Sequence, residues 1–598
     1  MSLFAELKRR NVFRVAAFYA AAVWALAQGI AQLAPLFGDY DWVARWFVIA
    51  AVIGFPFWIA FAWFYEFTPQ GLKRESEIDP ADPAAHRAGR RLDFAIIGVL
   101  AIAVVLLLTD RFVPGHGVNE GSAMVAPDNS IAVLPFTNLS SDEEQAYFAD
   151  GISEELLNLL ARIPQLQVTA RTSSFAFKGK ELGIPEIARQ LHVAHVLEGS
   201  VRKSGNTVRI TAQLIDAAAD KHLWSQSYDR RLDDIFAIQD EIAIDVVKQL
   251  RITLLGAAPS VRETDPAAYA LYLQAVQLGR QFNAEALQRS DALYRQALDI
   301  DPRYAPAWHG LSRNFTNQTN LGLLSSAEGF ARAREAADQA LALDPGYAPA
   351  QAALGYIAAG DNDLAAAAAH LQRALALAPG DPVVLGNSAL LLNSLGRLEP
   401  ALALSEALVR RDPVNLAALN NLGNAQRRAG RYDAAISSYR TVLSLSPGQG
   451  VAHFALGVAL LGKGDAPGAL AEIEQETSEV WKQIGLALAY HALGRKSESD
   501  TALAALIANH QEDWPYNIAY VHAYRGEADQ AFTWLARAVD YADSGLAEIV
   551  GENLFAKLHS DPRWTPFLRK LGKAPEQLAR IAFAVPLPDA AKPGDITP

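Results

Sequence analysis

The chain has 598 residues, which is too long for a single hydrophobic core, and 51% of them are hydrophobic. Its formal net charge of −12 provides no overall basic field, so no nucleic-acid partner is expected. The absence of cysteine excludes disulfides, thiolate metal sites and cysteine nucleophiles. The hydrophobic excess lies in the first 113 residues.

Three apolar runs in that region predict transmembrane helices at about residues 15–37, 46–65 and 92–113. The third run has a short apolar centre, so an alternative with two spans and a buried or interfacial third segment stays open. Lys and Arg cluster before the first run and between the second and third, whereas none follows the third run until Arg162. The positive-inside rule then predicts a multi-pass bacterial inner-membrane protein, with lipid as one partner and the large carboxyl-terminal part in the periplasm. Reading the first run as a cleaved signal peptide leaves that location unchanged.

A linker at 114–128 precedes a pattern that predicts a small α/β domain over residues 129–256. The expected elements, in chain order, are a strand at 130–136, a helix from a capping box at Ser141 to about 162, a strand at 166–171, a helix at 184–191, strands at 196–202 and 208–215, a strand at 223–228 and a helix at about 233–250. The turn Ser204-Gly205-Asn206 joins the middle pair of strands as a hairpin.

The wording of this region resembles the TolB-amino-terminal-like (FlgO-like) domain. The resemblance is carried by SIAVLPFTNLSSDEEQAYFADGISEELLNLL, HVLEGSVRKSGNTVRITAQLIDA and LWSQSYDRRLDDIFAIQDEIA. It implies a bacterial envelope or signalling protein in which the domain precedes a helical repeat array. Relatives often carry a nucleotide cyclase or a winged-helix module, but neither is present in this sequence. The opening LKRRNVFRVAAFY resembles the membrane module of one group of such proteins.

Three polar groups in this domain are candidate ligand sites. They are Asp142, Glu143, Glu144 and Asp150; the pair His192 and His195; and Arg171, Ser173, Ser174, Lys178 and Lys180. The acidic group follows the first strand, where α/β sheets often bind ligands, but helix capping also explains it. The histidine pair has no third ligand at a useful distance, so no metal is predicted. The basic group fits either an anion site or an exposed polar loop.

A fixed step of 34 residues dominates the rest of the chain. It relates Pro345, Pro379, Pro413 and Pro447; Gly355, Ala389, Gly423 and Gly457; and Ala367, Ala401, Ala435 and Ala469. Proline recurs where a helix stops, and small residues recur where two helices approach closely. This is the period of the tetratricopeptide repeat (TPR), a pair of antiparallel helices.

The TPR solenoid is predicted at 265–572, with about eight helix pairs up to 545 and a helical cap at 553–572. An insertion of nine residues lies between Phe315 and Ala331. The inter-helix glycines, at 396, 430, 464, 494 and 526, step by 34, 34, 30 and 32. Residues 573–598 are expected to be a flexible tail. The predicted fold class is therefore mainly α, with three transmembrane helices, a small α/β domain and an α-solenoid of TPR helix pairs.

The resemblance to TPR domains implies that proteins or peptides bind the concave face, which the first helix of each pair lines. The candidate groove residues are Asn387, Asn393, Asn420, Asn424, Arg427 and Arg428. Asparagine amides can pair with a peptide backbone and arginine can hold a carboxylate, although an ordinary solvated face explains the same residues.

No phosphate-binding, dinucleotide-binding, zinc-protease or nucleophile-elbow motif is present, so no catalytic residue, cofactor or metal is expected. The predicted function is a membrane-anchored periplasmic scaffold or sensor that binds proteins or peptides of the cell envelope. The alternative is an enzyme, or a regulatory subunit, with a small-molecule site in the middle α/β domain.

Overall fold

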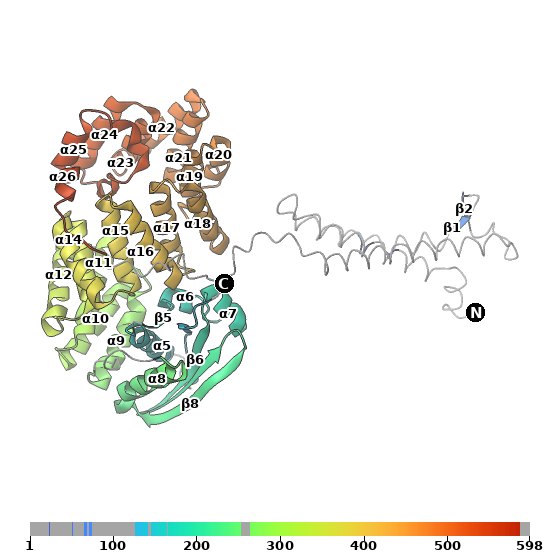
Figure 1. Ribbon diagram of the computed structural model, residues 1–598, viewed down its shortest axis with the longest axis vertical. Coiled ribbons are helices and arrows are strands. Elements are labelled where there is room, and N and C mark those ends of the chain that lie inside the picture. Colours follow the sequence, from blue (N-terminus) through green and yellow to red (C-terminus); the bar gives the residue numbers. More distant parts are fainter. Residues whose placement is uncertain are drawn as a thin grey trace, which may run out of the picture. The chain divides into compact units, whose positions relative to one another are not determined.

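A computed structural model describes residues 126–140, 145–163, 165–252 and 263–585. It also describes Tyr19, Val23, Ala51 and two short strands, β1 (Tyr65–Thr68) and β2 (Gly71–Arg74). The chain divides into two units, Met1–Met124 and Val125–Pro598, and each is described by itself. In the first unit, β1 and β2 pair as an antiparallel hairpin (Figure 1).

The described residues contain no helix that is both long enough and apolar enough to cross a membrane. A span needs about 20 apolar residues in one helix. The predicted fold class, which included three transmembrane helices, is therefore corrected to a helical repeat array with a small sheet domain. The segments predicted to span the bilayer, 15–37, 46–65 and 92–113, lie almost entirely outside the described residues.

The second unit begins with a sheet and its covering helices (Figure 1). The elements are β3 (Ser130–Val133), β4 (Thr137–Asn138), α5 (Ala146–Ala161), β5 (Gln167–Val168), α6 (Arg171–Phe175), α7 (Ile184–Leu191), β6 (His195–Ser204), β7 (Thr207–Asp216), β8 (Lys221–Arg231), the 3-10 turn η4 (Leu232–Asp234) and α8 (Ile235–Gln249). The strand order is β5-β3-β6-β7-β8, with β4 also beside β6. β3 is parallel to both neighbours, whereas β6, β7 and β8 form an antiparallel meander.

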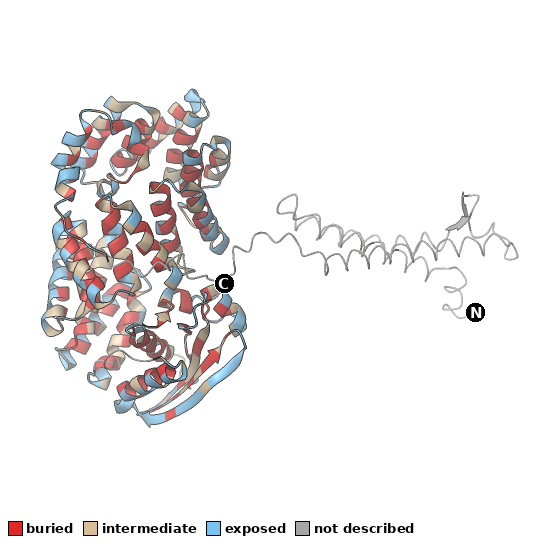
Figure 2. Cartoon of the chain, in the orientation of Figure 1, coloured by how far each residue is buried: buried red, intermediate tan, exposed pale blue. Residues whose placement is uncertain are grey.

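Strand alternation places the larger of this domain's two apolar clusters on one face of the sheet, and a smaller cluster with α7 lies on the other face. In β7, Val208, Ile210, Ala212 and Leu214 are buried, because successive side chains point to opposite faces. These four belong to the same apolar cluster as buried residues of α5 and α8. The outermost strand, β8, is exposed along most of its length and is largely pale blue in Figure 2.

Sequence patterns predicted the longer elements of this domain correctly. The hairpin turns at Gly205, whose φ of 57° favours glycine. The predicted strand at 166–171 is only β5, because α6 begins at Arg171. The capping box proposed at Ser141 lies outside the described residues, and α5 starts without a side-chain cap at Gln145.

Paired helices occupy residues 263–585, a stretch that is described throughout. They are α9 (Pro266–Gly279), α10 (Ala284–Ile300), α11 (Ala305–Asn320), α12 (Ser326–Leu343), α13 (Ala348–Gly360), α14 (Leu364–Leu377), α15 (Pro382–Ser394), α16 (Leu398–Arg411), α17 (Leu416–Arg428), α18 (Tyr432–Leu445), α19 (Ala452–Lys463), α20 (Ala466–Ile473), α21 (Glu479–Ala492), α22 (Lys496–His510), α23 (Pro515–Arg525), α24 (Ala528–Asp540), the 3-10 turns η5 (Ser544–Glu548) and η6 (Asn553–Leu558), α25 (Trp564–Lys570) and α26 (Pro575–Leu578). Within this stretch, α9 to α24 form the eight predicted pairs.

The repeated small residues mark close helix contacts. A Cβ atom at Gly423 would lie 2.6 Å from the Tyr439 ring, so α17 and α18 pack more closely there than any side chain would allow. Gly430, between these helices, has a φ of 73°, and the other four inter-helix glycines also have positive φ.

Where the repeat departs from the 34-residue step, the lengths of individual helices change. The insertion extends α11 and α12 to 16 and 18 residues, compared with 13 and 14 in α13 and α14. The later shortening falls on α20, which has only 8 residues.

Residues 573–585, predicted to be part of a flexible tail, instead pack against the array. Leu578 and Phe583 are 5% and 6% exposed and belong to an apolar cluster with residues of α14, α15 and α16. Proline and alanine content suggested a loose tail, but the apolar residues at alternate positions from Ile581 to Val585 give the segment one buried side. Residues 586–598 lie outside the described residues.

Candidate protein-binding face of the helical array

The candidate groove residues lie on α15 and α17, which are first helices of their pairs. Asn387 contacts the Ala352 carbonyl oxygen of α13 at 3.4 Å, and Asn424 Oδ1 accepts from the Tyr439 hydroxyl at 2.9 Å. Asn420 is half-buried. Asn393 is buried, and its Oδ1 has no hydrogen-bond partner in the described part of the chain. Arg427 and Arg428 are buried as well, so neither lies on an ordinary solvated face.

Arg427 holds a carboxylate, and that carboxylate belongs to the same chain. Its two terminal nitrogens donate to the two carboxylate oxygens of Glu552, both at 2.8 Å. Burial favours a raised pKa for Glu552, but the Arg427 guanidinium prevails and lowers that pKa to about 2. Arg428 donates to Glu548 at 2.5 Å, and the Asn553 amide donates to the Arg427 carbonyl oxygen at 3.0 Å. The segment from η5 to η6 therefore packs against the carboxyl end of α17.

The final described residues are bound to the array through their backbone. Arg397 donates from Nη1 to the Phe583 carbonyl oxygen at 2.9 Å and from Nη2 to the Ile581 carbonyl oxygen at 2.5 Å. The Ala584 amide donates to Gln372 Oε1 at 2.8 Å. Phe583 is buried, whereas Ala582 and Ala584 are exposed, which is the alternation of an extended segment. We call the array surface that contacts residues 581–585, including Gln372 and Arg397, the tail groove.

The middle domain occupies another part of the array. Buried Asp412, in the loop between α16 and α17, accepts from the Ser173 amide at 2.9 Å and the Ser173 hydroxyl at 2.6 Å. Ser173 Oγ in turn accepts from the Val414 amide at 3.0 Å, and the Ala170 amide donates to the Arg411 carbonyl oxygen at 2.6 Å. The start of α6 is thus fastened to a loop more than 230 residues further along the chain.

A second contact joins this domain to the first helix pair. A Cβ atom at Gly151 of α5 would lie 2.6 Å from Leu273 of α9, so these helices touch closely. Glu154 accepts from Arg171 Nε at 3.0 Å and is also paired with Arg280, beside α9. Burial opposes ionisation of Glu154, but the two guanidiniums lower its pKa below the usual value.

The pKa of the neighbouring carboxyl, that of Glu155, is shifted in the opposite direction. Burial and the Glu154 charge raise the pKa of Glu155 to about 7. Burial raises the pKa of four tyrosines of the array, and the Glu155 charge raises it further: Tyr269, Tyr272, Tyr304 and Tyr347. The rings of Tyr272 and Tyr304 meet edge to face at 5.2 Å. A carboxyl that is half neutral at pH 7 therefore lies at the junction of the two regions.

Several polar groups singled out in the middle domain have partners within the chain, whereas the buried Ser174 hydroxyl has none among the described residues. In the basic group, Ser173 binds Asp412, Arg171 binds Glu154, and Lys178 binds Asp150 at 2.5 Å. The other members of the acidic group, 142–144, lie outside the described residues.

The histidine pair does not point to a metal site. His192 ends α7 with a φ of 53°, and His195 begins β6. Across the described ranges, no three His, Cys, Asp or Glu side chains gather in a way that could hold a metal ion.

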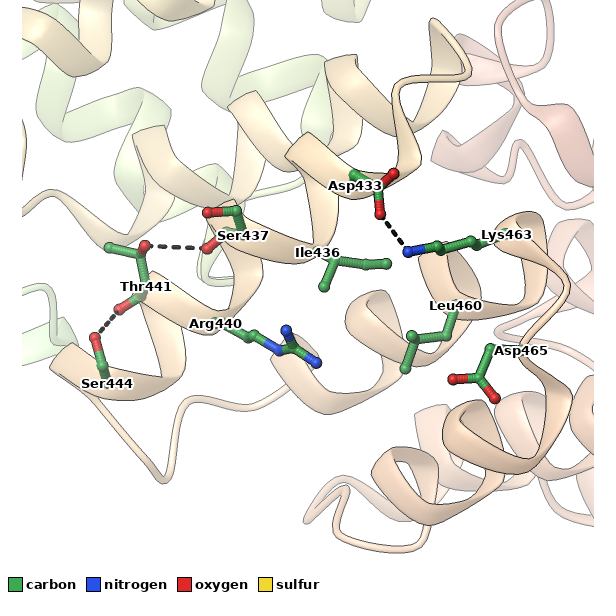
Figure 3. Close-up of a pocket in the computed structure, with 9 residues that line it drawn as sticks. All are labelled: Asp433, Ile436, Ser437, Arg440, Thr441, Ser444, Leu460, Lys463 and Asp465. Atoms are coloured by element: carbon green, nitrogen blue, oxygen red, sulfur yellow. Dashed lines mark hydrogen bonds and ion pairs between the residues drawn. The ribbon is translucent and has the colours of Figure 1, made fainter. Parts of the chain in front are cut away.

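A pocket of about 520 Å³ lies on α18 and α19, away from the predicted residues (Figure 3). Its lining consists of Asp433, Ile436, Ser437, Arg440, Thr441, Ser444, Leu460, Lys463 and Asp465. Lys463 is paired with Asp433 at 2.5 Å, and Asp465 caps α20 through the Gly468 amide. The Thr441 and Ser444 hydroxyls donate to carbonyl oxygens of their own helix. These interactions stabilise the helices that carry the side chains. The lining residues include no nucleophile paired with a base.

Sequence reasoning missed Gln372, Arg397, Asp412 and Glu155. One signal was available, namely the alternation of apolar residues from Ile581 to Val585, which predicts an extended buried segment. No local signal marked Asp412, because Asp-Pro pairs also occur at other repeat boundaries, as at Asp344.

Comparison with known proteins agrees with the helical pattern. The tetratricopeptide repeat family matches residues 323–382, 388–450 and 428–479. Tetratricopeptide repeats therefore make up residues 323–382 and 388–479 of the array. Among curated proteins, the chain is similar to a putative adenylate cyclase 3 of Rhizobium meliloti (strain 1021), with 46% identity over 199 residues. The match covers 32% of this chain and 34% of that protein, so the chain spans about a third of this relative's length.

Several solved structures are similar to part of this chain. PilF of Pseudomonas aeruginosa is 16% identical, with a TM-score of 0.30, and the match covers 35% of this chain and 93% of that chain. A tetratricopeptide repeat protein from Parabacteroides merdae is 17% identical, with a TM-score of 0.33, covering 42% and 98%. PilW, a type IV pilus biogenesis factor, is 18% identical, with a TM-score of 0.29, covering 43% and 99%.

Proposed function

We propose that the protein is a non-enzymatic scaffold whose TPR array binds segments of other proteins. The observation that carries this proposal is that the array already binds polypeptide. It holds residues 581–585 through backbone hydrogen bonds from Arg397 and to Gln372, and it holds the carboxylate of Glu552 through Arg427. Backbone hydrogen bonding with alternating buried side chains is how many modules bind extended peptides.

The finer part of the proposal concerns the partners. The resemblance of residues 129–256 to the TolB-amino-terminal-like domain supports proteins or peptides of the bacterial envelope as partners. Residues Asn420 and Asn424 are the part of the predicted groove that extends beyond the Glu548–Glu552 contacts, and we propose that they face such a partner. The predicted inner-membrane and periplasmic location stays a prediction.

Affinity capture with chemical crosslinking tests the scaffold role. Full-length protein is expected to retain specific partners, and the double variant Asn420→Ala, Asn424→Ala is expected to retain less of at least one of them. Asn420→Ala, at a partly exposed position, should change stability by less than about 0.5 kcal/mol. Asn424→Ala also removes the acceptor of the Tyr439 hydroxyl, so Asn420→Ala alone is the variant whose melting curve should be unchanged. Equal capture by wild type and variant would show that these asparagines do not contact a partner.

The relative named as a putative adenylate cyclase gives the alternative a specific form. If part of the matched region serves cyclase activity, purified full-length protein would convert ATP with a divalent metal to cyclic AMP. The scaffold proposal predicts no turnover above that of a heat-denatured sample. Sustained turnover that copurifies with the protein would replace the scaffold proposal with a catalytic one.

A further inference from the structure

The tail groove lies beside α14 and α16, where Figure 1 shows the red carboxyl-terminal helices next to the yellow part of the array. We propose that it is an exchangeable peptide site, which binds an extended segment of a partner protein in place of residues 581–585. The partner segment carries bulky apolar side chains at alternate positions, as Ile581, Phe583 and Val585 do. This inference rests on the proposed scaffold function and names the ligand class of that function.

The hydrogen bonds in the tail groove do not depend on the side chains of the bound segment. The hydrogen bonds involve the carbonyl oxygens of Ile581 and Phe583 and the amide of Ala584, which every extended peptide can offer. Selectivity comes from side chains on one side of the segment, since Phe583 is buried while Ala582 and Ala584 are exposed. A foreign segment with the same alternation can therefore make the same set of interactions.

The groove does not depend on its occupant for its own structure. Gln372 lies within α14 and Arg397 caps α16, and both helices pack with their own partners, α13 and α15. Residues 581–585 follow the last helix, α26, and contribute Phe583 as their only fully buried apolar side chain in the described range. Displacing them uncovers Phe583 and the partly buried Ile581 and Val585, and leaves the helix pairs in place.

The neighbouring carboxyl-terminal contact is not exchangeable in this way. Residues between η5 and η6 are held by the buried ion pair of Arg427 with Glu552, whose separation would leave two uncompensated charges. The two contacts therefore have different roles. The ion pair keeps the end of the array in position, whereas the last segment can leave the tail groove.

The test uses the full-length protein and a fluorescent peptide of residues 578–585, LARIAFAV. Wild type should bind this peptide weakly, because its own segment occupies the groove and reduces the apparent affinity by the fraction of open molecules. Phe583→Asp should weaken the internal segment and lower the Kd of the peptide at least tenfold. Ala582→Asp, at an exposed position of the same segment, is the matched control and should bind as wild type does.

Two further arms assign the binding to the groove. Adding Arg397→Gln to Phe583→Asp should abolish the gain, and a peptide with Asp in place of Phe should not bind. The inference is overturned if folded Phe583→Asp protein binds the peptide no better than wild type. If that variant fails to fold, hydrogen exchange on wild type decides: saturating peptide should speed exchange of the 582–585 amides, and unchanged exchange overturns the inference.

The outcome is separable from that of the proposed function. If crosslinked partners are still captured by a chain whose tail groove fails these tests, the scaffold role stands and the partner binds elsewhere on the array. If the peptide binds as expected but no protein partner is captured, the groove is a peptide site and the scaffold role fails.

Discussion

The TPR array binds its own chain in two regions, and the two contacts differ in kind. The middle domain shares an apolar core with the first helices of the array, and polar groups hold its edges, with Ser173 on Asp412 and two arginines on Glu154. The carboxyl-terminal segment is held by the buried ion pair of Arg427 with Glu552, by hydrogen bonds from Arg397 to its backbone, and by a short strip of apolar residues from Leu578 to Val585. The comparison teaches that one array can fix a neighbouring domain and at the same time hold a short segment that is able to exchange.

Breaking the ion pair should have the largest effect. Arg427→Met leaves the Glu552 carboxylate buried without its partner, and we expect the free energy of unfolding to fall by about 3–5 kcal/mol. Urea denaturation followed by circular dichroism measures it. The matched control is Arg431→Met, because the pair of Arg431 with Glu399 is exposed and should contribute less than about 1 kcal/mol. Equal losses in the two variants would contradict the assignment.

The same ion pair predicts how stability depends on acid. The folded state lowers the pKa of Glu552 from the ordinary 4.5 to about 2. Its contribution is therefore fully present above about pH 4.5 and is lost as the pH falls toward 2. Comparing wild type with Glu552→Gln between pH 2 and 6 measures this, and the stability difference between the two should shrink steadily below pH 4.5.

Removing the hydrogen bonds between Asp412 and Ser173 should lower the free energy of unfolding by less than breaking the ion pair does. Asp412→Ala removes the acceptor for the Ser173 amide and hydroxyl, and we expect a loss of about 2–3 kcal/mol. Hydrogen exchange should also increase at the start of α6. Asp344→Ala, two repeats earlier, is the control, because its carboxylate accepts from the nearby Gly346 amide. A greater loss at Asp344 than at Asp412 would refute the fastening role.

The effect expected at Glu155 has the opposite sign. Its raised pKa of about 7 means that the folded state favours the protonated form, so this group costs stability as the pH rises from 4.5 through 7. Glu155→Gln should leave stability unchanged at pH 4 and increase it at pH 8, where the wild-type carboxyl is ionised at the expense of stability. Glu154→Gln, one residue earlier, should destabilise at pH 8 because it loses its arginine partners. Thermal melts at the two pH values distinguish them.

Periodic features could be predicted from the sequence because each depends on neighbours within one repeat. The 34-residue step placed the helix pairs, and the small residue at 423 marked the contact of α17 with Tyr439. The alternation of apolar and polar residues likewise predicted the hairpin of β6 and β7.

The long-range contacts were not predictable in the same way. Arg427 with Glu552 and Ser173 with Asp412 join positions 125 and 239 residues apart, and no local pattern records such a pairing. Arg427 was predicted to bind a carboxylate from its chemistry and its place on α17. That its partner is in the same chain depends on how the end of the array curves back, which the sequence of a single repeat does not contain.

These long-range contacts change how the array should unfold. In an open solenoid each repeat touches only its neighbours, so terminal repeats fray and unfolding proceeds stepwise along the stack. Here the bond from Arg397 to Phe583 spans 186 residues, and the contact of Ser173 with Asp412 links the middle domain to the centre of the stack. Fraying of either end must break a contact with the interior, so the repeats between them should melt together in one cooperative transition. The same closed loops raise the contact order, which predicts slower folding than that of an open array of equal length.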